Sequence, residues 1–110
     1  MLKIEAVIQP FKLDEVCAAL KAIGVTGVMM QQVTEHDGKA KAYYRGAEYP
    51  AETPRVKIEV LACAERADEI VTALMHAART ASGDDGMILI YEVADAIRIH
   101  TGSHLQYTLS

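Results

Sequence analysis

Residues 2–24 read LKIEAVIQPFKLDEVCAALKAIG and contain the pattern that decides the fold. Apolar side chains fall at every second position in the first part of this stretch, which is the period of a half-buried strand. Pro10 ends the strand because proline cannot donate a hydrogen bond to a sheet. Apolar residues then recur at helical spacing as far as Ile23, and Gly24 supplies a C-terminal cap. The stretch therefore predicts a strand followed by a helix.

The strand–helix pattern occurs a second time. KIEAV at residues 3–7 is matched by KIEVL at residues 57–61, and both segments precede a helical pattern and a further strand. The remaining elements are expected as strands over 27–35, 55–63 and 87–93 and a helix over 67–78. Two tandem β-α-β units predict an α+β fold of the ferredoxin-like βαββαβ type, in which both helices cover one face of an antiparallel sheet.

The other face of this sheet has no helices to cover it. The nearly unbroken apolar run over 87–93 predicts a central strand. The apolar residues expected on the uncovered face are Val7, Val28, Met30, Leu61 and Leu89. Since such a set should not face water, we infer that copies of the chain associate through this face.

Length and composition set limits on the class of protein. A chain of 110 residues is the size of one domain (1–110), and 51% hydrophobic with 24% charged residues is the mix of a folded protein. The net charge of −4 gives no general attraction to nucleic acid or to anionic membranes. The sequence has no signal peptide and no apolar run of about 18 residues, so we expect a cytoplasmic protein without membrane insertion.

Metal binding and catalysis find little support in the pattern of reactive residues. Cys17 and Cys63 have no partner at CxxC spacing and are expected to be buried, inert thiols. His100 and His104 are four residues apart, but the Gly-Ser pair between them disfavours a helix, and two ligands do not complete a metal site. No Ser-His-Asp arrangement is visible, so no metal and no catalytic residue is expected.

The most distinctive segment is the polar stretch HDGKAKAYYRGAEYPAETP over residues 36–54. It lies between two expected strands and is predicted to be a long loop, and loops of this length in compact domains are usually functional or disordered. It contains three tyrosines, Tyr43, Tyr44 and Tyr49, whose rings offer contact area at a low entropic cost. We therefore expect this loop to carry the function.

A second candidate site follows the second helix. The segment over residues 81–86, ASGDDG, could hold a phosphate through its backbone N–H groups, although a Gly-Asp turn at the end of a helix is the commoner explanation. Met87 stands where a lysine would help a phosphate most. Arg98 and His100 follow the last strand, where they form either an anion-binding pair or an ordinary solvated edge.

Taken together, several segments resemble the PII signal-transduction family over nearly the whole chain. They are IQPFKLDEVCAAL (8–20), GVTGVMM (24–30), YRGAEY (44–49), PRVKIE (54–59), ARTASGDDG (78–86) and IRIHTG (97–102). The resemblance implies a homotrimer of ferredoxin-like subunits, with adenine nucleotides bound in the clefts between them and no covalent cofactor. It also implies that the loop over 36–54 is the family's T-loop, which responds to ligands and docks onto a target protein.

The resemblance assigns roles to individual positions. The residues matched to nucleotide binding are Gly27, Val28, Met29, Gly38, Glu59, Leu61, Gly83, Asp84, Asp85, Gly86, Met87, Arg98 and His100, of which the five over 83–87 belong to a phosphate loop over about 81–87. Arg45, Arg55 and Lys57, at or near the T-loop, are candidates for holding a small anion. Tyr44, Arg45 and Tyr49 are candidates for docking, and Tyr49 matches the tyrosine that some members have uridylylated.

The departures from the family pattern are as informative as the matches. The region over 35–40 has no glutamine, and the T-loop and the phosphate loop are both shorter than in the family. Met87 replaces the lysine of the phosphate loop, and His100 replaces an arginine. Losing two charge-assisted hydrogen bonds would weaken ATP binding by about two orders of magnitude or more. The pattern therefore resembles the divergent PII-like proteins, including a carboxysome-associated branch that senses ADP or AMP with bicarbonate.

Three alternatives remain open at this point. The first is a conventional PII protein that senses nitrogen through ATP and 2-oxoglutarate. The others are a small ferredoxin-like phosphate hydrolase that uses Arg45 or Arg98, and a trimeric metal-tolerance protein. The sequence does not name the target, which could be a membrane transporter, an enzyme or a transcription factor, nor does it say whether Tyr49 is modified.

Overall fold

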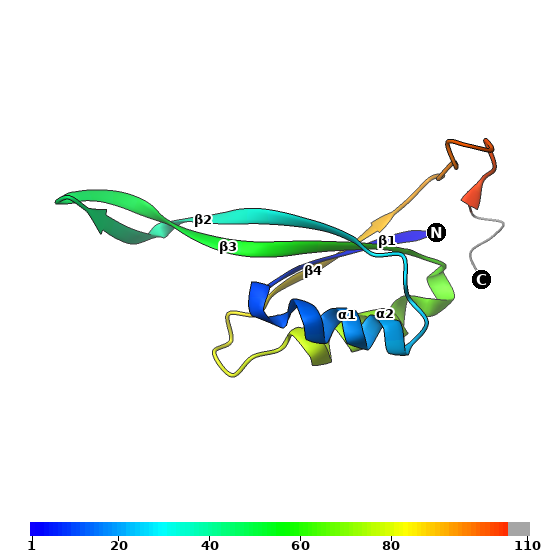
Figure 1. The fold of residues 1–110 in the computed structure, drawn as a ribbon, viewed down its shortest axis with the longest axis horizontal. Helices are drawn as coiled ribbons and strands as arrows, with labels where there is room; N and C mark the ends of the chain where they lie inside the picture. Colours follow the sequence, from blue (N-terminus) through cyan, green and yellow to red (C-terminus); the bar gives the residue numbers. More distant parts are fainter. Residues whose placement is uncertain (106–110) are drawn as a thin grey trace.

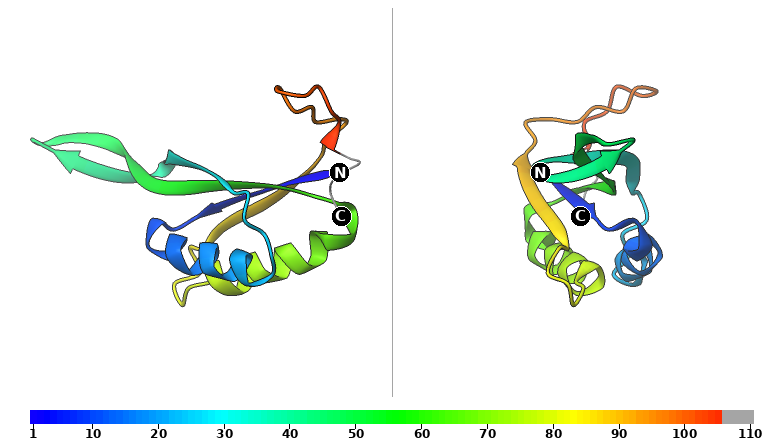
Figure 2. Two further views of the ribbon diagram at one scale, coloured as in Figure 1. Left: turned by 45° about the vertical axis from the view of Figure 1, so that its right-hand side comes forward. Right: turned by 90° about the vertical axis from the view of Figure 1, so that its left-hand side faces the viewer.

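The computed structural model describes residues 1–105, without the side chains of residues 37–44 and 48–51. One layer is a four-stranded antiparallel sheet and the other is a pair of helices that lie side by side beneath it (Figures 1 and 2). The elements are β1 (Leu2–Ile8), α1 (Leu13–Ala22), β2 (Met29–Tyr44), β3 (Ala47–Ala62), α2 (Ala67–Ala78) and β4 (Gly86–Glu92). The predicted ferredoxin-like βαββαβ fold is confirmed.

The strand order is β2-β3-β1-β4, so β1 and β3 are the inner strands. The prediction that residues 87–93 form a central strand is wrong, because β4 lies at an edge and pairs only with β1. Most side chains of this apolar run are exposed in one subunit, so the run does not mark a strand buried within it. Ile90 pairs with the buried Ile4 but is itself 54% exposed, since no further strand within residues 1–105 lies beside β4.

Each strand–helix unit enters its helix through a short 3-10 turn, Pro10–Lys12 before α1 and Ala64–Arg66 before α2. The predicted cap at Gly24 is confirmed. Gly24 has a φ of 84° and donates its N–H to the Lys21 carbonyl, while Val25 donates to the Leu20 carbonyl. This pair of bonds is the Schellman motif, which needs a left-handed residue where only glycine is unstrained.

The core lies between the sheet and the two helices. Its largest fully buried side chains are Ile4, Ile8, Val16, Leu20, Ile58, Ile70 and Leu74. They come from alternate positions of β1 and β3 and from one stripe on each helix, as the sequence periods predict. Met75 of α2 lies outside this stripe and is 45% exposed. Cys17 and Cys63 are partly exposed rather than buried.

Residues 36–54 form a hairpin and not the predicted loop. β2 and β3 remain paired as far as Tyr44 and Ala47, with one irregularity of register between Asp37 and Lys41. The chain reverses at Arg45 and Gly46, whose φ angles of 52° and 81° are those of a two-residue type I′ turn. We call residues 35–53 the arm, which projects from the body (Figure 1). It raises the radius of gyration to 16.8 Å, against about 13 Å for a compact chain of this length.

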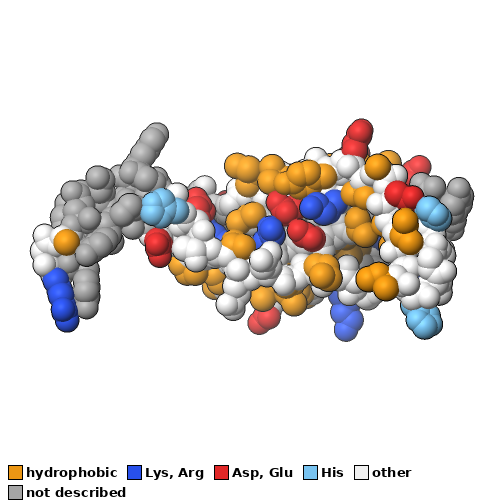
Figure 3. Space-filling model, turned by 90° about the horizontal axis from the view of Figure 1, so that it is seen from above, with side chains coloured by type: hydrophobic (Ala, Val, Ile, Leu, Met, Phe, Trp, Pro, Cys, Tyr) orange, Lys and Arg blue, Asp and Glu red, His pale blue; other side chains and the backbone are white. Residues whose placement is uncertain are grey.

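The uncovered sheet face differs from the prediction in composition. Val7, Leu61 and Leu89 lie on it, but Val28 packs against the core and Met30 pairs with Ile58 on the helix side. The middle of the face is charged, with Lys3, Glu5, Lys57 and Glu59 in mutual ion pairs (Figure 3). The helices in the described part of the chain are too short, or not apolar enough, to cross a membrane.

Candidate functional site

The α2–β4 loop, residues 79–85, is held in shape by its own side chains. An Asp85 carboxylate oxygen accepts hydrogen bonds from the backbone N–H of Thr80, at 2.7 Å, and from the Thr80 hydroxyl. The Thr80 and Ser82 hydroxyl oxygens are 2.8 Å apart, and the Asp84 N–H donates to Ser82 at 3.3 Å. These hydrogen bonds hold the loop around Thr80, Ser82 and Asp85, while the Asp84 carboxylate takes no part in them.

Gly86 fixes the point where this loop returns to the sheet. Its φ is +106°, and a Cβ atom built there would lie 1.8 Å from the carbonyl oxygen of Val7. No side chain fits so close to the backbone of β1, so this position requires glycine. Gly83 also has a positive φ of +80° but has open space around it.

Arg55 joins the loop to the base of the arm. Its Nε atom donates to Glu35 on β2 at 2.9 Å, and its Nη2 atom donates to Asp84 on the α2–β4 loop at 2.8 Å. Arg55 is only 3% exposed, whereas the side chains of Glu35 and Asp84 are 53% and 68% exposed. Gln9 adds a second tie, since its amide donates to the Asp84 carbonyl at 2.5 Å.

The charge of Arg55 is stabilised by these neighbours. Burial by itself lowers the pKa of Arg55, because desolvation disfavours the charged form. The hydrogen bonds and charges of Asp84 and Glu35 together outweigh that effect and raise the pKa above its ordinary value. Arg55 is therefore a permanent cation at the junction of arm, sheet and loop.

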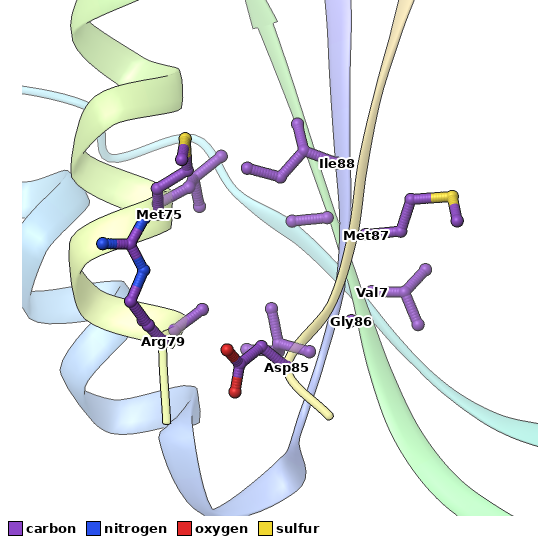
Figure 4. A pocket seen from close by; sticks show the side chains of 11 residues that line it. Val7, Met75, Arg79, Asp85, Gly86, Met87 and Ile88 are labelled. Carbon is purple, nitrogen blue, oxygen red and sulfur yellow. The ribbon is translucent and has the colours of Figure 1, made fainter. Parts of the chain in front are cut away.

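Two recesses flank this junction. One, of about 410 Å³, lies on the open side of the sheet and is lined by Val7, Val33, Thr34, Glu35, Arg55, Gly83, Asp84, Asp85, Gly86 and Met87. The other lies between β4 and α2, where Ile88 and Met75 face each other while Val7 and Met87 point to the opposite side of the sheet (Figure 4). The first recess thus brings the predicted residues over 83–87 together with Arg55.

A second group of predicted residues gathers at the other end of the sheet. Gly27, Leu61 and Arg98 line a recess there, together with Arg66, whose guanidinium donates to the Ile23 carbonyl. Arg98 belongs to a terminal hairpin over residues 95–105 that stands away from the body (Figure 1). A hydrogen bond of 2.7 Å between His104 Nδ1 and the Asp95 carboxylate joins the two sides of this hairpin, and the predicted His100 is exposed at its far end.

The remaining predicted nucleotide contacts lie elsewhere. Met29 and Glu59 line a shallow recess on the open sheet face with Lys57, and Glu59 forms ion pairs with Lys3 and Lys57. Val28 is turned toward the core. Gly38 lies in the arm, among the residues whose side-chain surroundings are outside the described part of the chain.

The comparisons with known proteins decide the family. Residues 1–103 match the family described as "Nitrogen regulatory protein P-II". The chain belongs to the P-II family. The resemblance to the PII family is thereby confirmed, and the match covers the fold, the arm and the terminal hairpin as far as residue 103.

Individual P-II proteins agree with the family match. The chain is 42% identical to the nitrogen regulatory protein P-II of Pasteurella multocida over 106 residues, covering 93% of this chain and 94% of the relative. It is 43% identical to that of Haemophilus influenzae over the same shares of both chains. Among solved structures, Arabidopsis thaliana PII bound to citrate is similar, with 27% identity and a TM-score of 0.77, covering 94% of this chain and 83% of the other.

Membership of the P-II family makes this chain a regulator and not an enzyme. The hydrolase and the metal-tolerance protein are therefore set aside. Among the described residues, no three His, Cys, Asp or Glu side chains gather where they could hold a metal ion.

The three predicted anion residues of this P-II chain do not form one cluster in the subunit. Arg55 is engaged by two carboxylates, and Lys57 lies 3.8 Å from Glu5 on the open face. Arg45 is at the turn of the arm, beyond Ala47, and Ala47 is already roughly 26 Å from Arg55 along β3 at about 3.3 Å per residue. The docking candidates Tyr44 and Tyr49 pair with Ala47 and Ala42 in the arm, but their side chains are outside the described residues.

Sequence reasoning missed two residues at the junction. Glu35 lies two positions beyond Val33, which pairs with Arg55, so a predicted hairpin would have placed Glu35 on the Arg55 face. Gln9 meets Asp84 across 75 positions of the chain, and no local pattern indicates that contact.

Proposed function

We propose that this protein is a homotrimeric P-II regulator of the cytoplasm that binds AMP or ADP in clefts between subunits. A small oxyanion such as bicarbonate acts as co-effector, and the arm carries the signal to a target protein, a transporter or an enzyme. This assigns the chain to the divergent PII-like branch of the family. A conventional P-II protein that responds to ATP and 2-oxoglutarate is the second candidate.

The separation of the predicted site residues is the observation that carries the proposal. Asp84 and Gly86 lie at the start of β4, whereas Arg98 and His100 follow its end. A strand of seven residues spans about 20 Å, which is longer than a nucleoside monophosphate. A nucleotide that contacts both groups must therefore lie between the loop of one copy and the terminal hairpin of another.

Exposed apolar side chains support association of several copies. Ile97 and Ile99 on the terminal hairpin are 57% and 102% exposed, so they contribute almost nothing to the core of one subunit. Met87, Leu89 and Tyr91 on the open side of β4 are also exposed, at 63%, 37% and 42%. Apolar surface on both the hairpin and the edge of the sheet is typical of an interface.

The charges around the loop favour nucleotides with few phosphates. Among the described residues that line the recess, three carboxylates, of Glu35, Asp84 and Asp85, are opposed by one cation, Arg55. Met87 adds no charge at the position where the resemblance expects a lysine. Within this recess of one subunit, each further phosphate therefore meets more repulsion than attraction, which favours AMP and ADP over ATP.

A small anion as co-effector draws support from a relative. The similar Arabidopsis protein was crystallised with citrate, a small carboxylate. In this chain Arg55 is the buried cation nearest the loop, and planar oxyanions match the guanidinium group in shape. The arm serves as the docking element in the proposal, with Tyr44, Arg45 and Tyr49 at its end.

Calorimetry of the purified protein tests the proposal. ADP, AMP and ATP are each titrated with and without bicarbonate or 2-oxoglutarate, and sedimentation gives the number of subunits. The proposal expects a trimer that binds ADP or AMP, more tightly with bicarbonate. Tight ATP binding that depends on 2-oxoglutarate contradicts it.

The second candidate has its own supporting observation. Identities of 42% and 43% to nitrogen regulatory proteins extend over 93% of the chain, and those relatives are named for nitrogen and not for carbon. The same titrations separate the two functions, since only the conventional protein requires 2-oxoglutarate for tight ATP binding.

A further inference from the structure

The guanidinium group of Arg55 is only partly used. Its Nη1 atom is buried and has no hydrogen-bond partner among the residues that the structure describes. Nε donates to Glu35 and Nη2 donates to Asp84. Asp84 therefore accepts one hydrogen bond from Arg55, whereas an oxyanion can accept two parallel hydrogen bonds from a guanidinium group. An unmet buried donor on a charged group is costly, so an additional acceptor at Nη1 would stabilise the site.

The two carboxylates that engage Arg55 are held differently. Glu35 belongs to β2, and Thr34 beside it pairs with Pro54 of β3. The paired strands therefore fix the backbone position of Glu35. Asp84 belongs to a loop, and its side chain is 68% exposed. It also lies between Gly83 and Gly86, both of which have a positive φ. Asp84 can therefore leave Arg55 for water, whereas Glu35 keeps the guanidinium in place.

We propose that Asp84 determines which ligands this site accepts, because its carboxylate occupies the place on Arg55 that a ligand oxyanion needs. A phosphate or bicarbonate group binds by displacing Asp84 and then accepts hydrogen bonds from both Nη1 and Nη2. The inference rests on the proposed function only for the identity of the natural ligand. The competition itself applies to any small oxyanion.

The exchange connects ligand binding to the loop and the arm. Displacing Asp84 removes the ion pair that ties the α2–β4 loop to β3, and leaves the hydrogen bond from Gln9 to hold the loop against the end of β1. The displaced carboxylate remains close to the ligand and repels its further charges. A ligand with one anionic group is therefore accepted more readily than a polyphosphate.

The test uses inorganic pyrophosphate, bicarbonate, ADP and AMP as probes, each titrated calorimetrically. Asp84→Asn removes the competing charge and keeps the shape of the side chain. Asp14→Asn is the matched control, since Asp14 is exposed on α1 and lines none of the recesses described above. Pyrophosphate is expected to bind Asp84→Asn about tenfold more tightly than the parent, a change of about 1.4 kcal/mol. The Asp14→Asn variant should match the parent, and adding Arg55→Gln to Asp84→Asn should remove the gain.

Two results overturn the inference. One is equal pyrophosphate affinity of the parent and Asp84→Asn, and the other is a gain that survives the loss of Arg55. Circular dichroism checks folding, and Asp84→Ala repeats the measurement if Asp84→Asn is unfolded. If pyrophosphate shows the gain but neither ADP nor AMP binds, the inference stands and the proposed function fails. If ADP binds but Asp84→Asn changes nothing, only the inference fails.

Discussion

Replacing Gly86 by alanine tests how the α2–β4 loop is attached to the sheet. The Cβ atom that Gly86→Ala introduces would lie 1.8 Å from the Val7 carbonyl oxygen and 2.9 Å from its carbon. Cβ atoms essentially never lie within 3.0 Å of such a neighbouring atom, so the two backbones must separate by at least 3.0 − 1.8 = 1.2 Å. The shift falls on the last pairs between β1 and β4, Ile8 with Gly86 and Val7 with Met87.

The magnitude follows from two contributions. A side chain at positive φ costs about 1–2 kcal/mol, and losing one or two ladder hydrogen bonds costs about 1 kcal/mol each. Gly86→Ala is therefore expected to lower the free energy of unfolding by about 2–4 kcal/mol, a large part of the roughly 5–15 kcal/mol typical of a domain. Gly83→Ala is the matched control, since its φ is also positive but nothing lies within 4 Å. It should cost only the first contribution.

Urea unfolding of the parent and both variants measures the difference. All three proteins are compared at the same concentration, because association of subunits adds to apparent stability. The reasoning is refuted if Gly86→Ala and Gly83→Ala unfold at the same urea concentration. A second expectation accompanies the first: only Gly86→Ala should speed amide exchange at the β1–β4 end of the sheet.

Three further predictions concern the core and the two ends of the molecule. Leu74→Ala, at a side chain only 1% exposed, should lower the free energy of unfolding by about 2–5 kcal/mol. A loss below about 1 kcal/mol in urea unfolding would mean that α2 is not packed as described. His104→Ala removes the partner of Asp95 from a surface pair, so stability should change by less than about 1 kcal/mol. Hydrogen exchange should nevertheless become faster at the Gly102 amide, which donates to the Arg98 carbonyl, and unchanged exchange contradicts a bracing role for the pair. Ile99→Asp, at a fully exposed position, should weaken self-association as measured by sedimentation. Phe11→Asp, at a residue 70% exposed before α1, should leave self-association unchanged. Equal sedimentation of the two variants argues against the hairpin as an interface.

The regular elements could be predicted because their signals are local. Alternation over β1 and helical spacing over α1 and α2 state which side faces the core, and Gly24 marks the end of α1 through its positive φ. The pattern did not say which strands lie inside the sheet. The apolar run of β4 suits a central strand, but the strand is at the edge of the subunit and its outer side chains are exposed.

The arm was misread because its sequence lacks the usual strand signals. It is rich in charged residues and is bounded on its return by Pro50 and Pro54, which argue against a strand in the interior of a sheet. The arm projects beyond the two-layer body, so no helix packs on it to impose an alternating apolar pattern. The turn itself had a signal in Arg45-Gly46, since glycine at the second position of a two-residue turn favours a hairpin.

The candidate site could be listed from the sequence but not assembled. The resemblance pointed to the residues over 83–87 and to Arg55, yet the contact between Asp84 and Arg55 joins a loop to a strand 29 positions away. Such contacts depend on the tertiary fold, and neither residue carries a pattern that names its partner. The position of Arg45 also depends on the tertiary fold. It lies far from Arg55 because β2 and β3 stay paired along the whole arm.

The repeated KIE motif explains the character of the open sheet face. Because β1 and β3 run antiparallel in the observed register, the two copies place Glu5 directly opposite Glu59. Like charges in that position destabilise a sheet, but each repeat also brings a lysine. Lys57 lies 3.8 Å from Glu5 and 4.0 Å from Glu59, and Lys3 lies 3.8 Å from Glu59. The four charges therefore cancel within one subunit, and another copy can approach this face through its apolar rim without having to supply a counter-charge.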